Sequence, residues 1–407
     1  MEHLKLKNFG PITELDINLK KINVFIGEQG VGKSTIAKLL TCLRDVFLRN
    51  CILEDNTESI SDFFSLYCMQ DYFNENTFIE YSDKLPIGID IDIIYKNGMF
   101  KIANDNPRKE ALIKFSRQML SEGLQEALAK HGIDIIKCTK EELGSYCTKY
   151  SRSIRTNMHT SLYCPAERGL IGTLSKSLAS ILVNEIPLPA ILVEYMSFFE
   201  KARNYFHNYS VDFLSLQYTF KDGDDLVTLG GKSVPLKDAS SGIQAILPLM
   251  MVMDYCLKEK YFDDFTIEEP ELNLFPNNQL GLLRFLLSRT NDEGLEIRSW
   301  ALTTHSPYTL SILNISLLAG MIVKKFPDAK ADVEKLLPSE YTIDPDEICV
   351  YALKKDGENK THCESIISTN GLISANYLDS VSESISDEFR NLNRVYISQL
   401  RANSENA

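Results

Sequence analysis

The sequence lacks several features that would indicate particular classes of protein. It has one tryptophan and nine cysteines, an odd number, and no two cysteines have the C-x-x-C spacing of a zinc or redox site. We therefore expect free thiols, as in a reducing cytoplasmic setting, rather than a disulfide framework. The first residues, Met1–Lys5, lack the basic and apolar segments of a signal peptide.

Long apolar runs are also missing. The longest, residues 245–253, is well short of the roughly 20 residues that a membrane-spanning helix needs, so we expect no membrane partner. The net charge of −13 argues against a surface coated with nucleic acid. One local basic stretch is either a solvated helical face or a nucleic-acid contact, and it contains Lys137, Lys140, Lys149, Arg152 and Arg155.

The strongest motif that is present is a phosphate loop, which matches G-x-x-x-x-G-K-[ST]. It consists of Gly27, Glu28, Gln29, Gly30, Val31, Gly32, Lys33, Ser34 and Thr35. Residues 21–26 are apolar and β-branched enough to predict a buried strand before the loop, and the spacing of apolar residues in 36–43 predicts a helix after it. In that context the glycines let backbone N–H groups face a polyphosphate, Lys33 adds a positive charge, and the Ser34 hydroxyl is placed for Mg²⁺. The flanking elements favour a nucleotide site over a plain glycine-rich turn.

Two adjacent acids end a second predicted strand, within the run Phe265–Leu274 (FTIEEPELNL). Glu268 would hold Mg²⁺ directly or through water, and Glu269 would orient or deprotonate an attacking water. The alternative is a solvent-exposed acidic loop, which Pro270 and the apolar flanks disfavour.

A histidine follows a third predicted strand, in Thr303-Thr304-His305-Ser306. From that position the ring N–H of His305 could contact a γ-phosphate, although taken alone this residue would be an ordinary satisfied histidine. Trp300 lies five residues earlier, so we expect bound nucleotide to change its fluorescence.

A serine–glycine motif precedes the apolar helix predicted over residues 245–257. Ser240, Ser241 and Gly242 offer hydroxyl and backbone donors that could bind an anion. A simple helix cap is the alternative, and capping is compatible with anion binding.

The order of these motifs resembles that of ABC-type ATPase heads: phosphate loop, Ser-Ser-Gly signature, Glu-Glu-Pro-Glu, then Thr-Thr-His-Ser. The details are similar to the bacterial branch related to RecF, SMC and OLD proteins. The resemblance covers the beginning of the chain and residues 238–310. It implies an enzyme that binds ATP and Mg²⁺, hydrolyses ATP, and forms a homodimer or higher homo-oligomer through its ATP sites.

The resemblance also assigns roles to single residues. It places Glu268 on the magnesium side, makes Glu269 the hydrolytic base and His305 the switch histidine, and has Ser240, Ser241 and Gly242 complete the phosphate-loop site of another protomer. Two departures stand out. Glu268 occupies a position where many relatives have aspartate, and no Q-loop glutamine can be assigned by spacing.

The expected fold class is α/β, with an ABC-ATPase-like phosphate-loop core of N-terminal antiparallel strands and a mainly parallel sheet. Residues 1–45 and 246–407 would form this core, with a C-terminal hairpin and helix. Residues 46–245 would form a large, mostly helical insertion that ends in a β-hairpin and the signature. Helices are expected over residues 108–130 and 170–206, the latter broken by two prolines.

The run Tyr163-Cys164-Pro165-Ala166-Glu167-Arg168 resembles a Pro-Ala-Glu-Arg element of the same bacterial branch. We expect it near the joint between core and insertion. Arg168 would there reach a phosphate or pair with an acid across the joint, and the sequence leaves both open.

Several functions fit such a head. The compact size and the run Thr369–Ile373 resemble ATPase subunits of bacterial antiphage systems of the Septu and PARIS kind, in which a separate nuclease or toxin is the effector. A DNA-repair clamp of the RecF or SMC kind is the alternative, which leaves nucleic acid a possible partner. A self-contained OLD-type nuclease is disfavoured because no strand ending in Glu-Gly precedes Asp344-Pro345-Asp346, which we interpret as a turn.

Overall fold

The computed structural model describes residues 2–84, 90–103, 161–174, 188–295, 297–357 and 360–374, with single residues 110, 125, 389, 390 and 392. The helix predicted over residues 108–130, the basic stretch and the C-terminal helix fall outside these ranges except for those single residues. The seven cysteines in the described part of the chain are all free.

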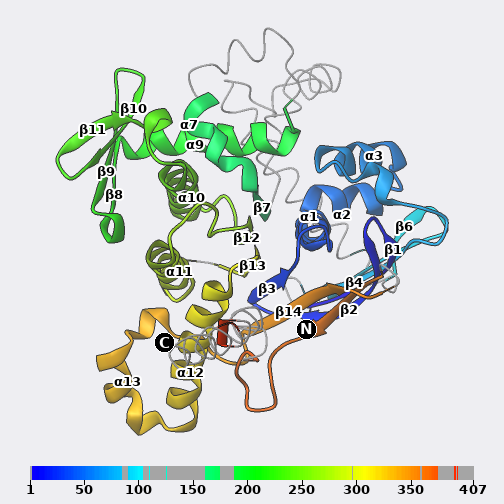
Figure 1. The fold of residues 1–407 in the computed structure, drawn as a ribbon. Helices are drawn as coiled ribbons and strands as arrows, with labels where there is room; N and C mark the ends of the chain where they lie inside the picture. The colour runs from blue at the N-terminus through cyan, green and yellow to red at the C-terminus, as the bar shows by residue number, and fades with distance from the viewer. Residues whose placement is uncertain are drawn as a thin grey trace, which may run out of the picture.

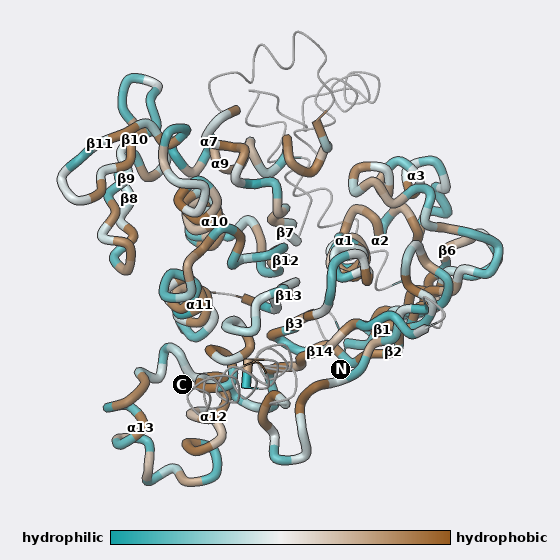
Figure 2. The backbone as a smooth tube through the Cα atoms, in the orientation of Figure 1, coloured by the Kyte–Doolittle hydropathy of each residue, from teal (hydrophilic) through white to brown (hydrophobic). Residues whose placement is uncertain are grey.

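The chain begins with an antiparallel hairpin, as predicted, of β1 (Glu2–Phe9) and β2 (Ile12–Leu19). Later strands extend it into a five-stranded sheet of order β2-β1-β4-β5-β6, with β4 (Phe78–Lys84), β5 (Asp90–Lys96) and β6 (Met99–Ile102). Buried and exposed residues alternate along β2, and Figure 2 shows hydrophobic and hydrophilic positions interleaved in this sheet.

The second sheet has six strands in the order β15-β14-β3-β13-β12-β7 (Figure 1). All neighbours in it are parallel except β14 and β15. Because the carboxyl ends of parallel strands meet at one edge, the loops after β3, β12 and β13 share that edge. The strands are β3 (Ile22–Gly27), β7 (Ser161–Cys164), β12 (Asp264–Glu268), β13 (Ser299–Thr304), β14 (Ile348–Lys355) and β15 (Thr361–Ser365).

Each face of the parallel sheet is covered by different elements. Phe25 and Ala301 belong to the hydrophobic cluster of the N-terminal sheet and α1 (Lys33–Arg44). Val24 and Leu302 point the other way, into the cluster that includes α10 (Ser241–Lys258), α11 (Pro276–Thr290) and α12 (Pro307–Lys325). The alternation of side chains along each strand produces these two cores.

Further helices complete the two cores. α2 (Val46–Leu53) and α3 (Thr57–Leu66) follow α1, and α9 (Ala190–Phe206) packs on α10. The remaining described turns and helices are η1 (Gln70–Tyr72), η3 (Ala166–Leu170), α7 (Ile171–Leu174), η4 (Asp212–Leu214), η5 (Leu236–Asp238), η6 (Pro327–Ala329), α13 (Lys330–Leu336) and η7 (Ser339–Tyr341).

The region expected to be a mostly helical insertion is richer in strands than predicted. β4, β5 and β6 join the sheet of β1, and β7 forms one edge of the parallel sheet. The predicted hairpin is present as β9 (Leu216–Lys221) and β10 (Asp224–Leu229), but β8 (Asn208–Val211) and β11 (Lys232–Pro235) extend it to four strands. These strands are short and several pair with distant partners, so local periodicity did not reveal them.

Within the described part of the chain, one helix, α12, has the length and apolar composition that would allow it to cross a membrane. Counting uninterrupted apolar residues missed it, because threonine, serine, asparagine and glycine punctuate its sequence. One side of the helix is buried, with Leu310, Leu313 and Leu317 in the core beside the parallel sheet.

Buried charges join the two sheets at the end opposite the phosphate loop. The carboxylate of Asp83, on β4, accepts hydrogen bonds from Arg49 on α2 and from Arg298, both at 2.9 Å. Arg298 also pairs with Asp264, the first residue of β12. Both carboxylates are buried, so this pairing fixes β4 against the parallel sheet.

Candidate functional site

The phosphate loop lies between β3 and α1, as the sequence predicts. Gly32 has a φ of +98°, and a Cβ atom there would lie 2.3 Å from the Ile12 side chain. A Cβ on Gly27 would lie 2.3 Å from the backbone oxygen of Leu353 on β14. The loop therefore requires glycine at both positions. Gly32 is needed for its backbone angle, and Gly27 is needed for the close approach to β14.

Lys33 is buried and turns back onto the loop. Its Nζ donates to the backbone oxygens of Gly27 at 2.8 Å and Glu28 at 2.7 Å. Burial lowers the pKa of Lys33 to about 8, although three nearby carboxylates oppose the shift, those of Glu269, Glu271 and Glu268. The amine is thus held at the helix N-terminus by two uncharged acceptors, which charged phosphate oxygens can replace.

The tip of β12 carries an acid with spare ligand capacity. Glu268 is 6% exposed, and its Oε1 has no hydrogen-bond partner among the described residues. Burial and then this carboxylate raise the pKa of the neighbouring Tyr163 hydroxyl. A buried unsatisfied carboxylate oxygen fits Mg²⁺, which prefers oxygen ligands. Ser34, exposed in the first turn of α1, is the predicted second ligand.

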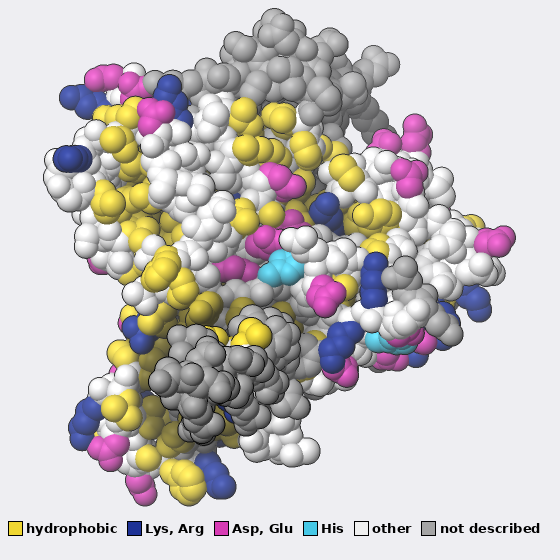
Figure 3. Space-filling model, in the orientation of Figure 1, with side chains coloured by type: hydrophobic (Ala, Val, Ile, Leu, Met, Phe, Trp, Pro, Cys, Tyr) yellow, Lys and Arg dark blue, Asp and Glu magenta, His cyan; other side chains and the backbone are white. Residues whose placement is uncertain are grey.

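Glu269 and His305 face one another, although they follow different strands. The Oε1 of Glu269 lies 3.5 Å from Nε2 of His305, and Nδ1 of His305 lies 3.5 Å from Nζ of Lys33. The structure therefore brings three predicted site residues together. Both Glu269 and His305 are about one-third exposed. Figure 3 shows acidic and histidine side chains gathered where this face of the molecule is hollowed.

Glu269 adopts an uncommon backbone conformation. Its φ is +41°, in the left-handed region that costs a non-glycine residue about 1–2 kcal/mol. Its N–H donates to the oxygen of Thr303 on β13 at 2.9 Å. This turn ends β12 and directs the Glu269 side chain toward His305.

Glu271 is a site residue to which sequence reasoning gave no role. Its Oε1 accepts from the Thr304 hydroxyl at 2.6 Å and from the N–H of His305 at 2.8 Å. It therefore fastens the acidic loop to the histidine loop. The only sequence signal was its place as the last acid of Glu-Glu-Pro-Glu.

Arg168 contacts main-chain oxygens rather than the phosphate or acid that the sequence left open. It is fully buried, and its guanidinium donates to the backbone oxygens of Pro165, Glu268 and Glu269 at 3.0, 2.6 and 2.6 Å. The sequence analysis placed Arg168 near the joint between core and insertion. It could not identify these acceptors, because every residue has the same backbone oxygen.

The serine–glycine motif begins α10 but stands apart from the phosphate loop. Ser240 is the N-cap without a side-chain capping bond, and Ser241 is exposed. No hydrogen bond or ion pair within the described ranges joins Ser240, Ser241 or Gly242 to residues 27–35. A cavity of about 460 Å³ lies beside the motif and includes the exposed side chains of Phe213, Leu229 and Phe275.

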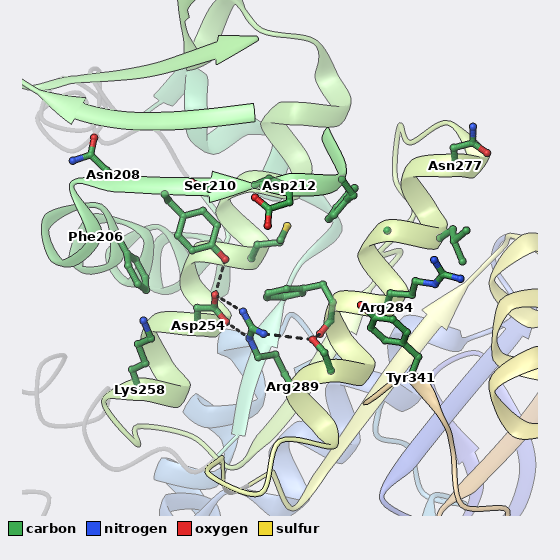
Figure 4. Close-up of a pocket in the computed structure, with 18 residues that line it drawn as sticks. Phe206, Asn208, Ser210, Asp212, Asp254, Lys258, Asn277, Arg284, Arg289 and Tyr341 are labelled. Atoms are coloured by element: carbon green, nitrogen blue, oxygen red, sulfur yellow. Dashed lines mark hydrogen bonds and ion pairs between the residues drawn. The ribbon is translucent and has the colours of Figure 1, made fainter. Parts of the chain in front are cut away.

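A larger groove, of about 620 Å³, lies between β8, α10 and α11 (Figure 4). Two of its charged groups are engaged with each other, since Asp254 accepts from Arg289 at 2.6 Å, and Asp254 also accepts from the Tyr209 hydroxyl at 2.6 Å. Phe213 packs so closely on α11 that a Cβ on Gly281 would lie 2.2 Å from its ring. We interpret this groove as the place where the four-stranded sheet is attached to the core.

Comparison with solved structures gives heads of SMC proteins at low identity. The SMC head domain from Thermotoga maritima is 11% identical with a TM-score of 0.41, over 89% of this chain and 98% of that one. An SmcHead bound to the C-winged helix domain of ScpA is 9% identical with a TM-score of 0.37, over 89% and 97%. An Smc head domain bound to the C-terminal domain of ScpA, derived from Pyrococcus furiosus, is 10% identical with a TM-score of 0.37, over 96% and 100%.

No curated protein matches the sequence. A family model described as the AAA ATPase domain matches residues 1–186 and 110–310, which together span the phosphate loop, the acid pair and the histidine loop. This match extends over more than half of the chain, and the chain therefore belongs to the AAA ATPase domain family.

Proposed function

We propose that this ATPase closes as a dimer around ATP and uses hydrolysis to reopen. The observation that carries the proposal is the convergence of Lys33, Glu269 and His305, while the serine–glycine motif lies apart from them. A half-site of this kind is complete only when a second copy supplies the missing donors. The exposed apolar side chains beside the motif, those of Phe213, Leu229 and Phe275, are suited to burial against that copy.

Each residue then has a defined task. Lys33 and the loop N–H groups bind phosphate oxygens, and Ser34 and Glu268 hold the magnesium ion. That ion, when bound, neutralises charge on the phosphates. Glu269 accepts a proton from the attacking water, and His305 orients toward the terminal phosphate. Ser240, Ser241 and Gly242 act on the nucleotide of the opposite protomer.

The finer part of the proposal concerns what the closed dimer controls. The motif order and the Thr369–Ile373 run resemble ATPase subunits of antiphage systems, so we infer a cytoplasmic regulator or scaffold for a partner nuclease or toxin. Free thiols throughout the described chain are consistent with that compartment. Differential affinity of the open and closed states for ATP would drive the change that the partner detects.

The test is the Glu269→Gln variant, which keeps the shape of the side chain and removes the proton acceptor. We expect ATP turnover to be abolished, ATP binding to persist, and a dimer to accumulate with ATP and Mg²⁺ in size-exclusion chromatography with light scattering. Glu293→Gln, an exposed glutamate outside the site, is the matched control and should behave as wild type.

Two results would overturn the proposal. Wild-type turnover by Glu269→Gln would remove the base assignment, and a monomer under all nucleotide conditions would remove the dimer. Turnover that depends on added duplex DNA would favour the clamp function over the effector regulator.

A further inference from the structure

We propose that Arg168 is a positioning residue that holds the main chain of Glu269 in its hydrolytic conformation. This inference rests on the proposed function, because it assigns a role within the same ATPase site. Arg168 acts through the backbone of the two acids, because its guanidinium donates to the main-chain oxygens of Glu268 and Glu269.

The hydrogen bonds explain why a guanidinium is needed. In an extended strand, successive backbone oxygens point to opposite sides, so one group cannot normally bind two in a row. The left-handed angle at Glu269 turns the chain, and the oxygens of Glu268 and Glu269 then both reach Arg168, from Nη1 and Nη2 at 2.6 Å each. The planar fork of arginine matches two such acceptors at once.

The location of Arg168 supports the same role. β7 pairs with β12 as far as Cys164 opposite Ile267, and the next residue on that side is Pro165, which has no N–H to continue the ladder. Arg168 fills the missing donor positions from the turn η3. Its third bond, to the Pro165 oxygen at 3.0 Å, fixes the guanidinium to its own turn.

Burial of this cation indicates that more than packing is involved. Arg168 is 0% exposed, and in the described part of the chain its guanidinium bonds to backbone oxygens and to no carboxylate. An unpaired buried charge is costly, so a structural link at this position would be better made by a neutral side chain. The cation instead lies directly behind Glu268 and Glu269, where its hydrogen bonds fix the main chain of both acids.

The turn that carries Arg168 also packs on the helix that begins with the serine–glycine motif. Gly169 lies against Ala245 of α10, so that a Cβ atom at position 169 would lie 3.9 Å from the Cβ of Ala245, and Gly172 lies against Leu236. A shift of the amino end of α10 on contact with a second protomer would therefore reach Glu269 through Arg168.

The test compares Arg168→Lys with wild type in the full-length protein. Lysine keeps the charge but cannot donate to both oxygens in the same fixed plane. We expect kcat for ATP to fall about 10²-fold, while the dissociation constant for ATP, measured with the protein at equilibrium, changes less than threefold. Arg203→Lys is the control, because Arg203 is a partly buried arginine that pairs with Asp225 away from the acids; its kcat should stay at the wild-type value.

Chemical rescue separates positioning from folding. Arg168→Ala should lose turnover in the same way and regain part of it with added guanidinium at millimolar concentration, whereas Arg203→Ala should gain nothing. Unchanged kcat in Arg168→Lys would overturn the proposal. So would a loss of turnover that is accompanied by an equal loss of ATP affinity. Absence of ATP turnover in the wild-type protein would instead count against the proposed function itself.

Discussion

The carboxylate of Glu271 holds the backbone of His305 in place through a 2.8 Å hydrogen bond from the histidine N–H to Oε1. The same oxygen accepts from the Thr304 hydroxyl, so one side chain joins the ends of β12 and β13. Lys33 belongs to β3's loop on the far side of β13 and reaches His305 at 3.5 Å. The site is therefore assembled from three neighbouring strand ends, with Glu271 as the connection between two of them.

We predict that Glu271→Ala separates His305 from Glu269. The free energy of unfolding should fall by about 1–3 kcal/mol, because the N–H of His305 loses a charged acceptor. Turnover should fall at least tenfold with ATP binding retained, since a small displacement of a catalytic group is costly. Glu271→Gln is the control. It keeps an acceptor oxygen, so its turnover should lie between that of Glu271→Ala and that of the wild type. Equal turnover in Glu271→Ala and wild type would contradict the role.

The pKa of Lys33 predicts a proton linkage to nucleotide binding. Burial lowers this pKa from 10.5 to about 8, so the amine is partly neutral above pH 8. Phosphate oxygens favour the charged form and raise the pKa again. ATP binding should therefore take up protons between about pH 8 and 10.5, and affinity should weaken as pH rises through this range.

Calorimetry measures this uptake directly. At pH 8.5 the binding enthalpy should vary between buffers of different ionisation enthalpy, and the variation should be smaller in Lys33→Ala, which binds ATP more weakly. Identical proton uptake in the two proteins would show that the linked proton belongs to another group.

The buried pairing of Asp83 predicts acid sensitivity. Burial alone would raise the pKa of this carboxyl, but Arg49 and Arg298 outweigh it and hold the pKa well below the ordinary 3.8. A depressed folded-state pKa gives stability that is fully present above the unfolded-state pKa and is lost as pH falls below it. We therefore expect Asp83→Asn to lower the free energy of unfolding by about 3–5 kcal/mol near neutral pH. The loss should become progressively smaller below pH 3.8.

Urea unfolding at pH 7 and at pH 3 tests this difference. Asp62→Asn, on the exposed side of α3, should cost almost nothing at either pH. If Asp83→Asn lowers the free energy of unfolding by the same amount at both pH values, the stabilisation comes from packing rather than from the charge.

The sequence predicted the parts of the site that depend on local pattern. The phosphate loop, the hairpin of β1 and β2, and the strands that end at Glu268 and just before His305 follow from glycine spacing and apolar periodicity over about ten residues. Such patterns are complete within one segment, so they can be recognised without knowing what packs against them.

The contacts that the sequence did not predict join segments that are far apart in the chain. Arg168 binds backbone oxygens 100 residues away, and backbone oxygens have no residue identity to detect. Closeness in sequence is also a poor guide to distance within a strand: Trp300 and His305 lie at opposite ends of β13, roughly 16 Å apart at about 3.3 Å per residue. Trp300 is fully buried; a change in its fluorescence on nucleotide addition stays a prediction, and a silent tryptophan would weaken the assignment of His305 as the switch.

Completion of the site by a second copy can be tested by mixing two inactive variants. Ser241 is exposed in the first turn of α10, whereas Gly242 is buried against the Asn273 backbone oxygen, so Ser241→Arg should fold normally and obstruct only an outside surface. Lys33→Ala removes the phosphate-binding amine. Each protein alone should hydrolyse no ATP.

In a mixed dimer, the Lys33 of one variant meets the Ser241 of the other, and one of the two sites is intact. Random pairing of equal amounts makes half of the dimers mixed, so turnover per chain should recover to roughly a quarter of the wild-type value. The double variant mixed with either single variant is the control, because every site in it is damaged. If Ser241 served the phosphate loop of its own chain, mixing would restore nothing, since each chain already carries its own defect and no exchange of partners could remove it.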